Sequence, residues 1–280
     1  MDLNTVTGFA PATDAVWRHG DAWLGGGTWL FSQPQPAVTR LLDLHAFGWT
    51  PIRETDDGVV IAATCTLAQL ASWQPARAAY APAAVLARQC CHALLGSFKV
   101  HHVATVGGNI CLSLPAGPMI SLASALDGTV LLRSVGRSGA GESGPGDGRP
   151  AGRALPAADF VTGSTTNKLR PGELLTHLSL PRAALRASTA FRQLSLSPVG
   201  RSAVLVIARR DPGGQTVVSV TASTPRPVCL RFPAPPVPAE ALAQLDARDP
   251  EYLDDVQGSL PWRRAMTRRL LVEALGELDG

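Results

Sequence analysis

The sequence predicts an α+β protein, with a larger N-terminal part and a small antiparallel sheet with helices at the C-terminal end. The β-type runs of the N-terminal part do not alternate regularly with long helices, which argues against a doubly wound parallel sheet. Three further β-type runs follow one another after residue 200, and a helical pattern closes the chain. With 280 residues, the chain can form one large domain or two of ordinary size.

Composition excludes several classes of protein. A hydrophobic content of 45% with 17% charged residues suits a globular chain with a sizeable core rather than a disordered one. The net charge of +3 is small, and an exposed helix face explains pairs such as Arg263-Arg264 better than nucleic-acid binding does. No run approaches the roughly 18 apolar residues of a membrane span, and residues 1–10 lack the basic start of a signal peptide.

Cysteine usage favours a reducing compartment. The five cysteines include no Cys-x-x-Cys, and the adjacent pair Cys90-Cys91 suits neither a disulfide framework nor a zinc site. We therefore expect free thiols and a cytoplasmic protein. The chain also lacks the cysteine ligands for an iron–sulfur cluster of its own.

The N-terminal part begins with short strands followed by two helices. The β-type runs cover residues 22–24 and 59–62, and residues 38–44 suit a strand or a short turn. Thr66 can cap a short helix over 67–72. A second helix has Pro82 in its first turn, apolar residues through Leu95 and Gly96 as its stop.

A mostly apolar stretch over residues 110–126, broken by Pro115 and Pro118, follows these helices. Further strands are predicted over 129–132 and 174–180. The Gly/Ser/Arg-rich run Ser134–Gly152 between them has no hydrophobic periodicity and predicts a mobile surface loop.

The composition shifts near residues 183–188, which predicts two domains, 1–182 and 188–280. In the second, turn residues separate three strands of an antiparallel meander, over 204–208, 216–221 and 228–232. The proline-rich link 233–238 then leads to two helices, the last starting near Ser259. Its apolar stripe is predicted to comprise Trp262, Ala265, Met266, Leu270, Ala274 and Leu278.

Two glycine clusters, Leu24-Gly25-Gly26-Gly27-Thr28 and Ala104-Thr105-Val106-Gly107-Gly108-Asn109, carry the strongest functional signal. Each follows apolar residues and supplies a hydroxyl, and glycine allows backbone amides to point inward at an anion. An ordinary turn explains either cluster alone, but the pair predicts two tight loops that converge on one pyrophosphate. Neither cluster fits a P-loop or the G-x-G-x-x-G dinucleotide pattern.

These clusters, together with Arg170-Pro171-Gly172-Glu173-Leu174-Leu175, resemble in order and spacing the FAD-binding medium subunit of molybdenum hydroxylases, of the xanthine dehydrogenase and aerobic carbon monoxide dehydrogenase type. Residues 255–259 extend the resemblance toward the last helix. It implies a two-part FAD-binding domain of the vanillyl-alcohol oxidase (PCMH) type, followed by a C-terminal flavoprotein domain.

The resemblance also implies the cofactor and its contacts. The two clusters would hold the pyrophosphate and ribose of FAD, Leu95 would lie near the ring or adenine side, and Leu169 near the isoalloxazine. Arg192 matches a position that usually carries a basic residue, where a cation could stabilise reduced flavin. The cofactor-binding residues expected in this way are Leu24, Gly25, Gly26, Gly27, Thr28, Trp29, Leu30, Leu95, Thr105, Val106, Gly107, Gly108, Asn109, Leu169 and Arg192. No catalytic side chain and no metal site are expected.

Some positions depart from the family pattern. The residues Val100-His101-His102 stand where Ile-Arg-Asn is frequent, and neighbours in a strand would point to opposite faces, which argues against shared metal ligation. Pro118 replaces a common aspartate, Trp29 a position that is often polar, and Ser164-Thr165-Thr166 a frequent aromatic and basic group.

The resemblance implies an electron-transfer flavoprotein in a heteromeric complex. Its flavin would accept electrons from a [2Fe–2S] partner subunit fed by a molybdopterin subunit, and pass them to NAD⁺, oxygen or another acceptor. One alternative is a scaffold subunit that keeps the fold with weak or no FAD. Another is a free-standing flavin oxidase, although no histidine or cysteine is placed for covalent flavin attachment. A nucleophile set of Ser97, His101 or His102 and Asp127 lacks a G-x-S-x-G elbow.

Overall fold

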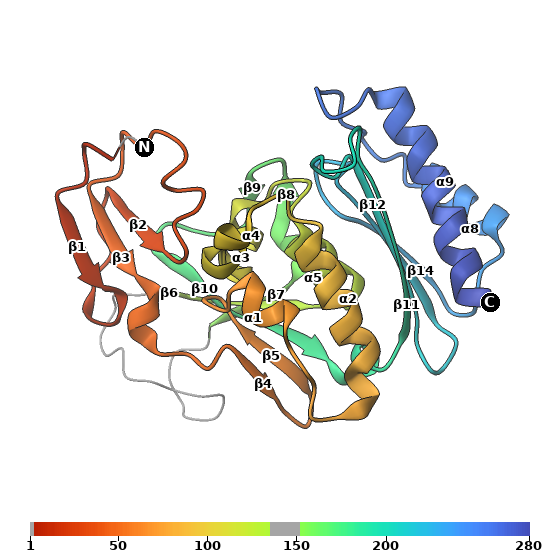
Figure 1. Cartoon of the computed structure of the whole chain (residues 1–280), viewed down its shortest axis with the longest axis horizontal. Helices are drawn as coiled ribbons and strands as arrows, with labels where there is room; N and C mark the ends of the chain where they lie inside the picture. The colour runs from red at the N-terminus through yellow and green to blue at the C-terminus, as the bar shows by residue number, and fades with distance from the viewer. Residues whose placement is uncertain (1–2, 135–151) are drawn as a thin grey trace.

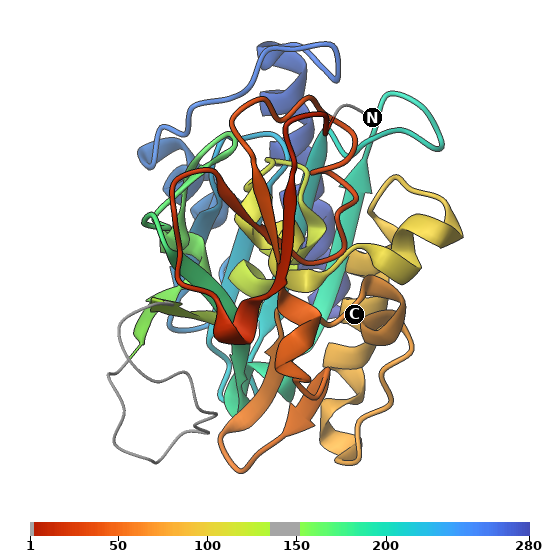
Figure 2. The ribbon, with the colours of Figure 1, turned by 90° about the vertical axis from the view of Figure 1, so that its left-hand side faces the viewer.

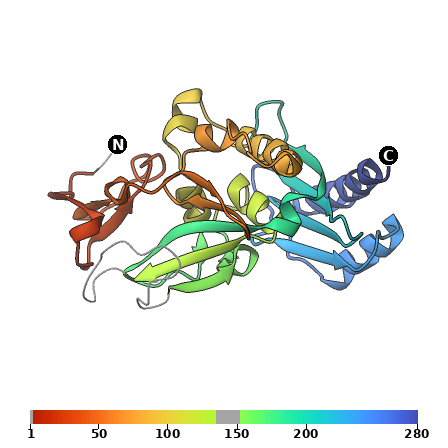
Figure 3. The same cartoon turned by 90° about the horizontal axis from the view of Figure 1, so that it is seen from below.

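The computed structural model describes residues 3–134 and 152–280, so nearly all of the predicted loop Ser134–Gly152 lies outside the described residues. The three larger sheets of the described residues lie side by side along the longest axis (Figures 1 and 3). A small N-terminal lobe stands at one end, a central sheet with most of the helices in the middle, and a C-terminal sheet with two helices at the other end. The predicted α+β class is confirmed.

The N-terminal lobe is a three-stranded parallel sheet in the order β1-β3-β2, formed by Gly8–Pro11, Arg40–Asp43 and Asp21–Leu24. Figure 2 shows this lobe in front of the central part. It has a small core of its own, comprising Ala12, Ala15, Leu42, Leu44 and Leu174. Strand β3 falls within a predicted run and β2 begins one residue before its predicted run, whereas β1 carries no β-type signal because its four residues include a glycine and a proline.

The central sheet has five strands in the order β4-β5-β10-β6-β7, and all its pairs are antiparallel. These strands are β4 (Ile52–Glu54), β5 (Gly58–Ala62), β10 (Glu173–Pro181), β6 (Thr129–Ser134) and β7 (Arg153–Pro156), and a small hairpin follows with β8 (Val161–Gly163) and β9 (Thr166–Asn167). The predicted strands β5, β6 and β10 are confirmed. Strands β4 and β7 are too short to show a period.

Helices pack around this sheet, and α2 and α5 lie between it and the C-terminal sheet (Figure 1). They are α1 (Leu67–Ala71), α2 (Ala81–His92), α3 (Phe98–Val103), α4 (Val106–Leu112), α5 (Pro118–Ala125), and the single turns α6 (Ala157–Phe160) and α7 (Arg182–Leu185). Thr66 and Gln69 form a capping box on α1, as the sequence led us to expect of Thr66. Helix α2 begins as predicted but ends at His92, before Gly96.

Two predictions about local structure in this region are wrong. The cluster around Gly107 is not a second tight loop, because Thr105 caps helix α4 and the two glycines lie in its first turn. His101 and His102 lie on helix α3 rather than on a strand. Among the described residues, no group of three or more His, Cys, Asp or Glu side chains is placed to hold a metal ion.

The C-terminal sheet has four strands rather than three, in the order β11-β12-β13-β14. They are Ser188–Leu194, Val204–Arg210, Thr216–Thr221 and Val228–Phe232. The first lacks a β-type signal because Arg192 and Gln193 interrupt its apolar residues. Helices α2 and α5 pack on one face, and α8 (Pro238–Ala247) and α9 (Leu260–Asp279) cover the other (Figure 1). Every residue of β13 is buried because both faces are covered.

The prediction for helix α9 is wrong at two residues. Ala265 of the predicted stripe is exposed, whereas Arg263 is buried rather than part of a solvated face. The Arg263 guanidinium donates to the carbonyl oxygens of Ala203 and Ala222 at 2.8 and 2.6 Å, and pairs with Asp255.

No helix within the described ranges is long and apolar enough to cross a membrane. The domain division at 183–188 stays a prediction.

All five cysteines are free. Burial raises the pKa of the Cys65, Cys91 and Cys111 thiols to about 12. These thiols are therefore protonated and weakly reactive; Cys65 and Cys91 are buried in the core, and Cys111 is partly buried beside it.

Candidate cofactor site

The first glycine cluster begins where strand β2 ends. Gly27 has φ of +69°, a left-handed conformation that favours glycine. Its carbonyl oxygen accepts a hydrogen bond from the backbone amide of Phe31 at 2.8 Å, which closes a turn over the intervening residues. Thr28 and Trp29 are exposed in this turn, and Leu30 is half-buried.

The second glycine cluster forms the rigid start of helix α4. The Val106 and Gly107 amides donate to the carbonyl oxygens of Cys65 and Ala63 at 2.8 and 2.9 Å. The Gly108 amide donates to the Thr105 hydroxyl at 3.1 Å, an N-cap. These amides therefore have protein partners, and the expectation that they form an open anion nest is not met.

Close packing explains the first glycine of α4. A Cβ on Gly107 would lie 2.5 Å from the Cβ of Ala63, so a larger residue would force the helix away from the end of β5. Neither Gly107 nor Gly108 has a positive φ. Asn109 also has a local role, since its side-chain oxygen accepts a hydrogen bond from the Met119 amide at the start of α5 (3.0 Å).

The structure brings the two glycine clusters together, although about 80 residues separate them in the sequence. A Cβ on Gly25 would lie 3.0 Å from the Thr105 hydroxyl oxygen. A Cβ on Gly26 would lie 1.7 Å from the Val103 carbonyl oxygen, a distance that no real Cβ tolerates. The backbone of the first cluster is thus pressed against the junction of α3 and α4.

The first cluster differs from the second in its hydrogen bonding. Within the described parts of the chain, the backbone amides of Gly26, Gly27 and Thr28 donate no hydrogen bond to another protein group. The two glycines are half-buried and Thr28 is exposed. Unpaired amides in consecutive residues are the donors that an anionic ligand requires.

Leu95 precedes helix α3 in the chain, and Leu169 is connected to helix α4 through hydrogen bonds. Leu95 is 59% exposed, between α2 and α3. The Leu169 amide donates to the side-chain oxygen of Asn167 at 2.9 Å. The Asn167 side-chain amide donates in turn to the Cys111 carbonyl oxygen at 2.7 Å, near the end of α4.

Arg192 lies elsewhere. It pairs in register with Val206, whose side chain faces α8 and α9. Its guanidinium forms ion pairs with Glu273 and Glu277 of α9, so it lies on the face of the C-terminal sheet that is turned away from α2 and α5. The structure therefore does not bring Arg192 to the glycine clusters, and its contact with the flavin stays a prediction.

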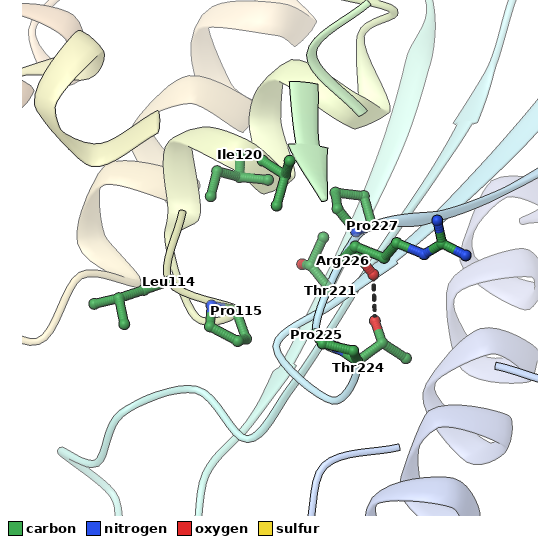
Figure 4. Close-up of a pocket in the computed structure, with 9 residues that line it drawn as sticks. Leu114, Pro115, Ile120, Thr221, Thr224, Pro225, Arg226 and Pro227 are labelled. Carbon is green, nitrogen blue, oxygen red and sulfur yellow. Dashed lines mark hydrogen bonds between the residues drawn. The ribbon is translucent and has the colours of Figure 1, made fainter. Parts of the chain in front are cut away.

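Two depressions lie at the joint with the C-terminal sheet and not at the glycine clusters. One, of about 430 Å³, includes the buried Arg209 and its ion-pair partner Asp127. The other, shown in Figure 4, brings Pro115 and Ile120 opposite Thr221 and Pro225, and leaves no room for a water molecule. Both depressions therefore lie between the central part of the fold and the C-terminal sheet.

The family to which the chain belongs follows from its sequence match. The profile of the FAD binding domain in molybdopterin dehydrogenase matches residues 10–183. The chain belongs to this family. FAD is accordingly its cofactor, and the predictions of a flavoprotein and of a flavin-containing oxidoreductase subunit of the molybdenum hydroxylase type are confirmed. No curated protein is significantly similar in sequence.

Solved structures share the fold over nearly the whole length. CO dehydrogenase from Oligotropha carboxidovorans is 21% identical with a TM-score of 0.78, covering 99% of this chain and 98% of that chain. Carbon monoxide dehydrogenase from Hydrogenophaga pseudoflava, in a form lacking the Mo-pyranopterin moiety, is 20% identical with a TM-score of 0.75, covering 97% and 96%. Quinoline 2-oxidoreductase from Pseudomonas putida 86 is 18% identical with a TM-score of 0.74, covering 99% of each chain.

Proposed function

We propose that this FAD subunit relays electrons within a heteromeric, cytoplasmic molybdenum hydroxylase. The bound flavin would accept electrons from a [2Fe–2S] subunit, which would itself receive them from a molybdopterin-containing subunit, and would pass them to NAD⁺, oxygen or another acceptor. The flavin supplies the redox chemistry, whereas the chain binds and orients it. The similarity in fold to carbon monoxide dehydrogenase and to quinoline 2-oxidoreductase supports this assignment.

The observation that carries the proposal is the row of unpaired amides at Gly26, Gly27 and Thr28. These donors suit the diphosphate bridge of FAD, because hydrogen bonds to a charged acceptor are stronger than those between neutral groups. In this proposal the second cluster contributes the Thr105 hydroxyl and a rigid wall, rather than free amides.

The unpaired amides of Gly26, Gly27 and Thr28 form the proposed diphosphate cradle. Apolar side chains near this cradle would contact the organic rings of FAD. Trp29, the residue after the first cluster, is 38% exposed. Phe98 and Val103 are exposed on α3, the helix whose last residue abuts Gly26. Leu95 and Leu169 stay in the proposed site, whereas Arg192 pairs with α9 and lies away from the glycine clusters.

Titration of the purified chain with FAD, FMN and riboflavin tests this cradle. Two hydrogen bonds from backbone amides to the diphosphate should favour FAD over riboflavin by more than about 100-fold, since each hydrogen bond to a charged group contributes about 1.5 kcal/mol or more. Equal affinity for the two flavins would contradict the proposed contacts. A purified complex without a visible flavin band would favour the scaffold alternative, and co-purifying [2Fe–2S] and molybdopterin subunits would support the electron relay.

A further inference from the structure

The turn before strand β10 joins the N-terminal lobe to the rest of the protein. Residues Arg170–Glu173 form this turn, which follows Leu169 in the chain and closes with a hydrogen bond from the Glu173 amide to the Arg170 carbonyl oxygen at 2.9 Å. Gly172 has φ of +78° and packs beside the indole of Trp17 in the N-terminal lobe. Leu174, the residue after the turn, belongs to the core of that lobe.

The carboxylate of Glu173 holds the turn together from inside. Glu173 is only 6% exposed. Its two oxygens accept hydrogen bonds from Arg153 at 2.7 and 3.3 Å, and one also accepts from the Arg170 amide at 2.9 Å. The same Arg153 donates to the Lys168 carbonyl oxygen at 2.7 Å, so this ion pair fixes both sides of Leu169.

The backbone of Glu173 connects to the first glycine cluster. Its carbonyl oxygen accepts a hydrogen bond from the indole nitrogen of Trp23 at 2.8 Å. Trp23 lies on β2, two residues before Gly25, so this bond links the Glu173 turn directly to the strand that presents the unpaired amides. Glu173 thus makes two contacts: its side chain forms an ion pair with Arg153, and its backbone carbonyl oxygen accepts a hydrogen bond from Trp23 of the N-terminal lobe.

We propose that Glu173 is a positioning residue for FAD, which fixes the N-terminal lobe so that the amides of Gly26–Thr28 face the wall formed by α3 and α4. It acts through Arg153 and Trp23 and does not contact the cofactor. This inference rests on the proposed function. Without the carboxylate, Arg153 loses its partner, the turn relaxes, and the carbonyl that holds Trp23 is no longer fixed.

The variant Glu173→Gln tests the role of the charge with little change of shape. We expect FAD affinity to fall about tenfold, the effect of losing a hydrogen bond to a charged group. Amide hydrogen exchange should accelerate over residues 24–30. Asp246→Asn is the matched control, because the exposed Asp246–Arg268 pair between α8 and α9 lies outside the site, and both readouts should stay at wild-type values.

A pH profile separates positioning from general destabilisation. Arg153, together with the amide and charge of Arg170, holds the pKa of Glu173 below its usual value, so docking of the lobe is favoured above the ordinary glutamate pKa of 4.5 and is lost as the pH falls through the lowered value. Wild-type FAD affinity should fall across this acidic range, and Glu173→Gln should lack this step.

A second variant keeps the inference testable if Glu173→Gln does not fold. Trp23→Phe removes only the indole donor, and it should also accelerate exchange over residues 24–30. Unchanged affinity and exchange in Glu173→Gln, with FAD-binding wild type, would overturn the positioning role. If the wild type itself does not bind FAD, the proposed function fails, and the exchange measurement still decides whether Glu173 fixes the lobe.

Discussion

Individual glycines in this protein serve different physical purposes. Gly27 adopts a left-handed conformation, whereas Gly26 and Gly107 leave room for a backbone or side chain that would collide with a Cβ. The sequence pattern predicts that glycines matter at these positions but not which reason applies, because close approach depends on residues far away in the chain. Val103 and Ala63 supply that contact.

Substitution Gly26→Ala should abolish tight FAD binding. Its Cβ would lie 1.7 Å from the Val103 carbonyl oxygen, so the first cluster must move away from α3. Gly213→Ala is the matched control, since a Cβ there meets nothing within 4 Å. Flavin fluorescence titration of both variants checks the expectation, and wild-type affinity in Gly26→Ala would contradict the packing described above.

His177 should make stability depend on pH. Burial lowers its pKa from 6.5 to about 4, with the charges of Arg133 and Arg53 adding to the effect. The unfolded chain therefore binds the proton more readily, and the free energy of unfolding should fall as the pH drops from 6.5 to 4, by up to about 3 kcal/mol at 1.36 kcal/mol per pKa unit. Denaturation of His177→Phe at several pH values should show a smaller loss over this window.

At the scale of elements, strong local signals predict structure and short elements do not. The runs of β5, β6, β10 and β12–β14 are long or rich in β-branched residues, and the sequence predicts all of them. Strand β1 depends on pairing with β3, which is distant in sequence, and β4 is a short strand that pairs with the neighbouring β5. The glycine clusters were predicted as candidate site segments, but the amide pairing that distinguishes them depends on Cys65 and Ala63, which no local pattern reveals.

Substitution Thr105→Val should destabilise the start of α4. The Thr105 hydroxyl accepts the Gly108 amide, and loss of such an N-cap costs about 1 kcal/mol of the free energy of unfolding. Thr105→Ser retains the acceptor and serves as the control. Urea denaturation of both variants measures the difference, and equal stability would show that the cap contributes nothing.

At the scale of the whole molecule, buried polar groups join the C-terminal sheet to its neighbours. Ala222 has φ of +66° at the end of β13, where its amide donates to the Pro115 carbonyl oxygen and its own carbonyl accepts from Arg263. This residue therefore links the loop between α4 and α5 to α9. The sequence assigns Arg263 to solvent because only the packed structure shows the two carbonyl groups that it satisfies.

Substitution Arg263→Met should destabilise the fold by about 3 kcal/mol, because the buried carbonyl groups of Ala203 and Ala222 lose their donor. The neighbouring Arg264 is exposed, so Arg264→Met should have little effect. Chemical unfolding followed by circular dichroism compares the two. A similar loss in both variants would contradict the structural role of the buried guanidinium.

The separate small core of the N-terminal lobe also bears on the order in which the protein melts. A unit with few buried apolar residues opens at a lower free energy than the larger cores beside it. A ligand held between that unit and its neighbours raises its opening free energy by mass action. On heating, residues 3–48 should open first in the empty protein, and a saturating flavin concentration should delay that event more than the melting of the sheet formed by β11–β14.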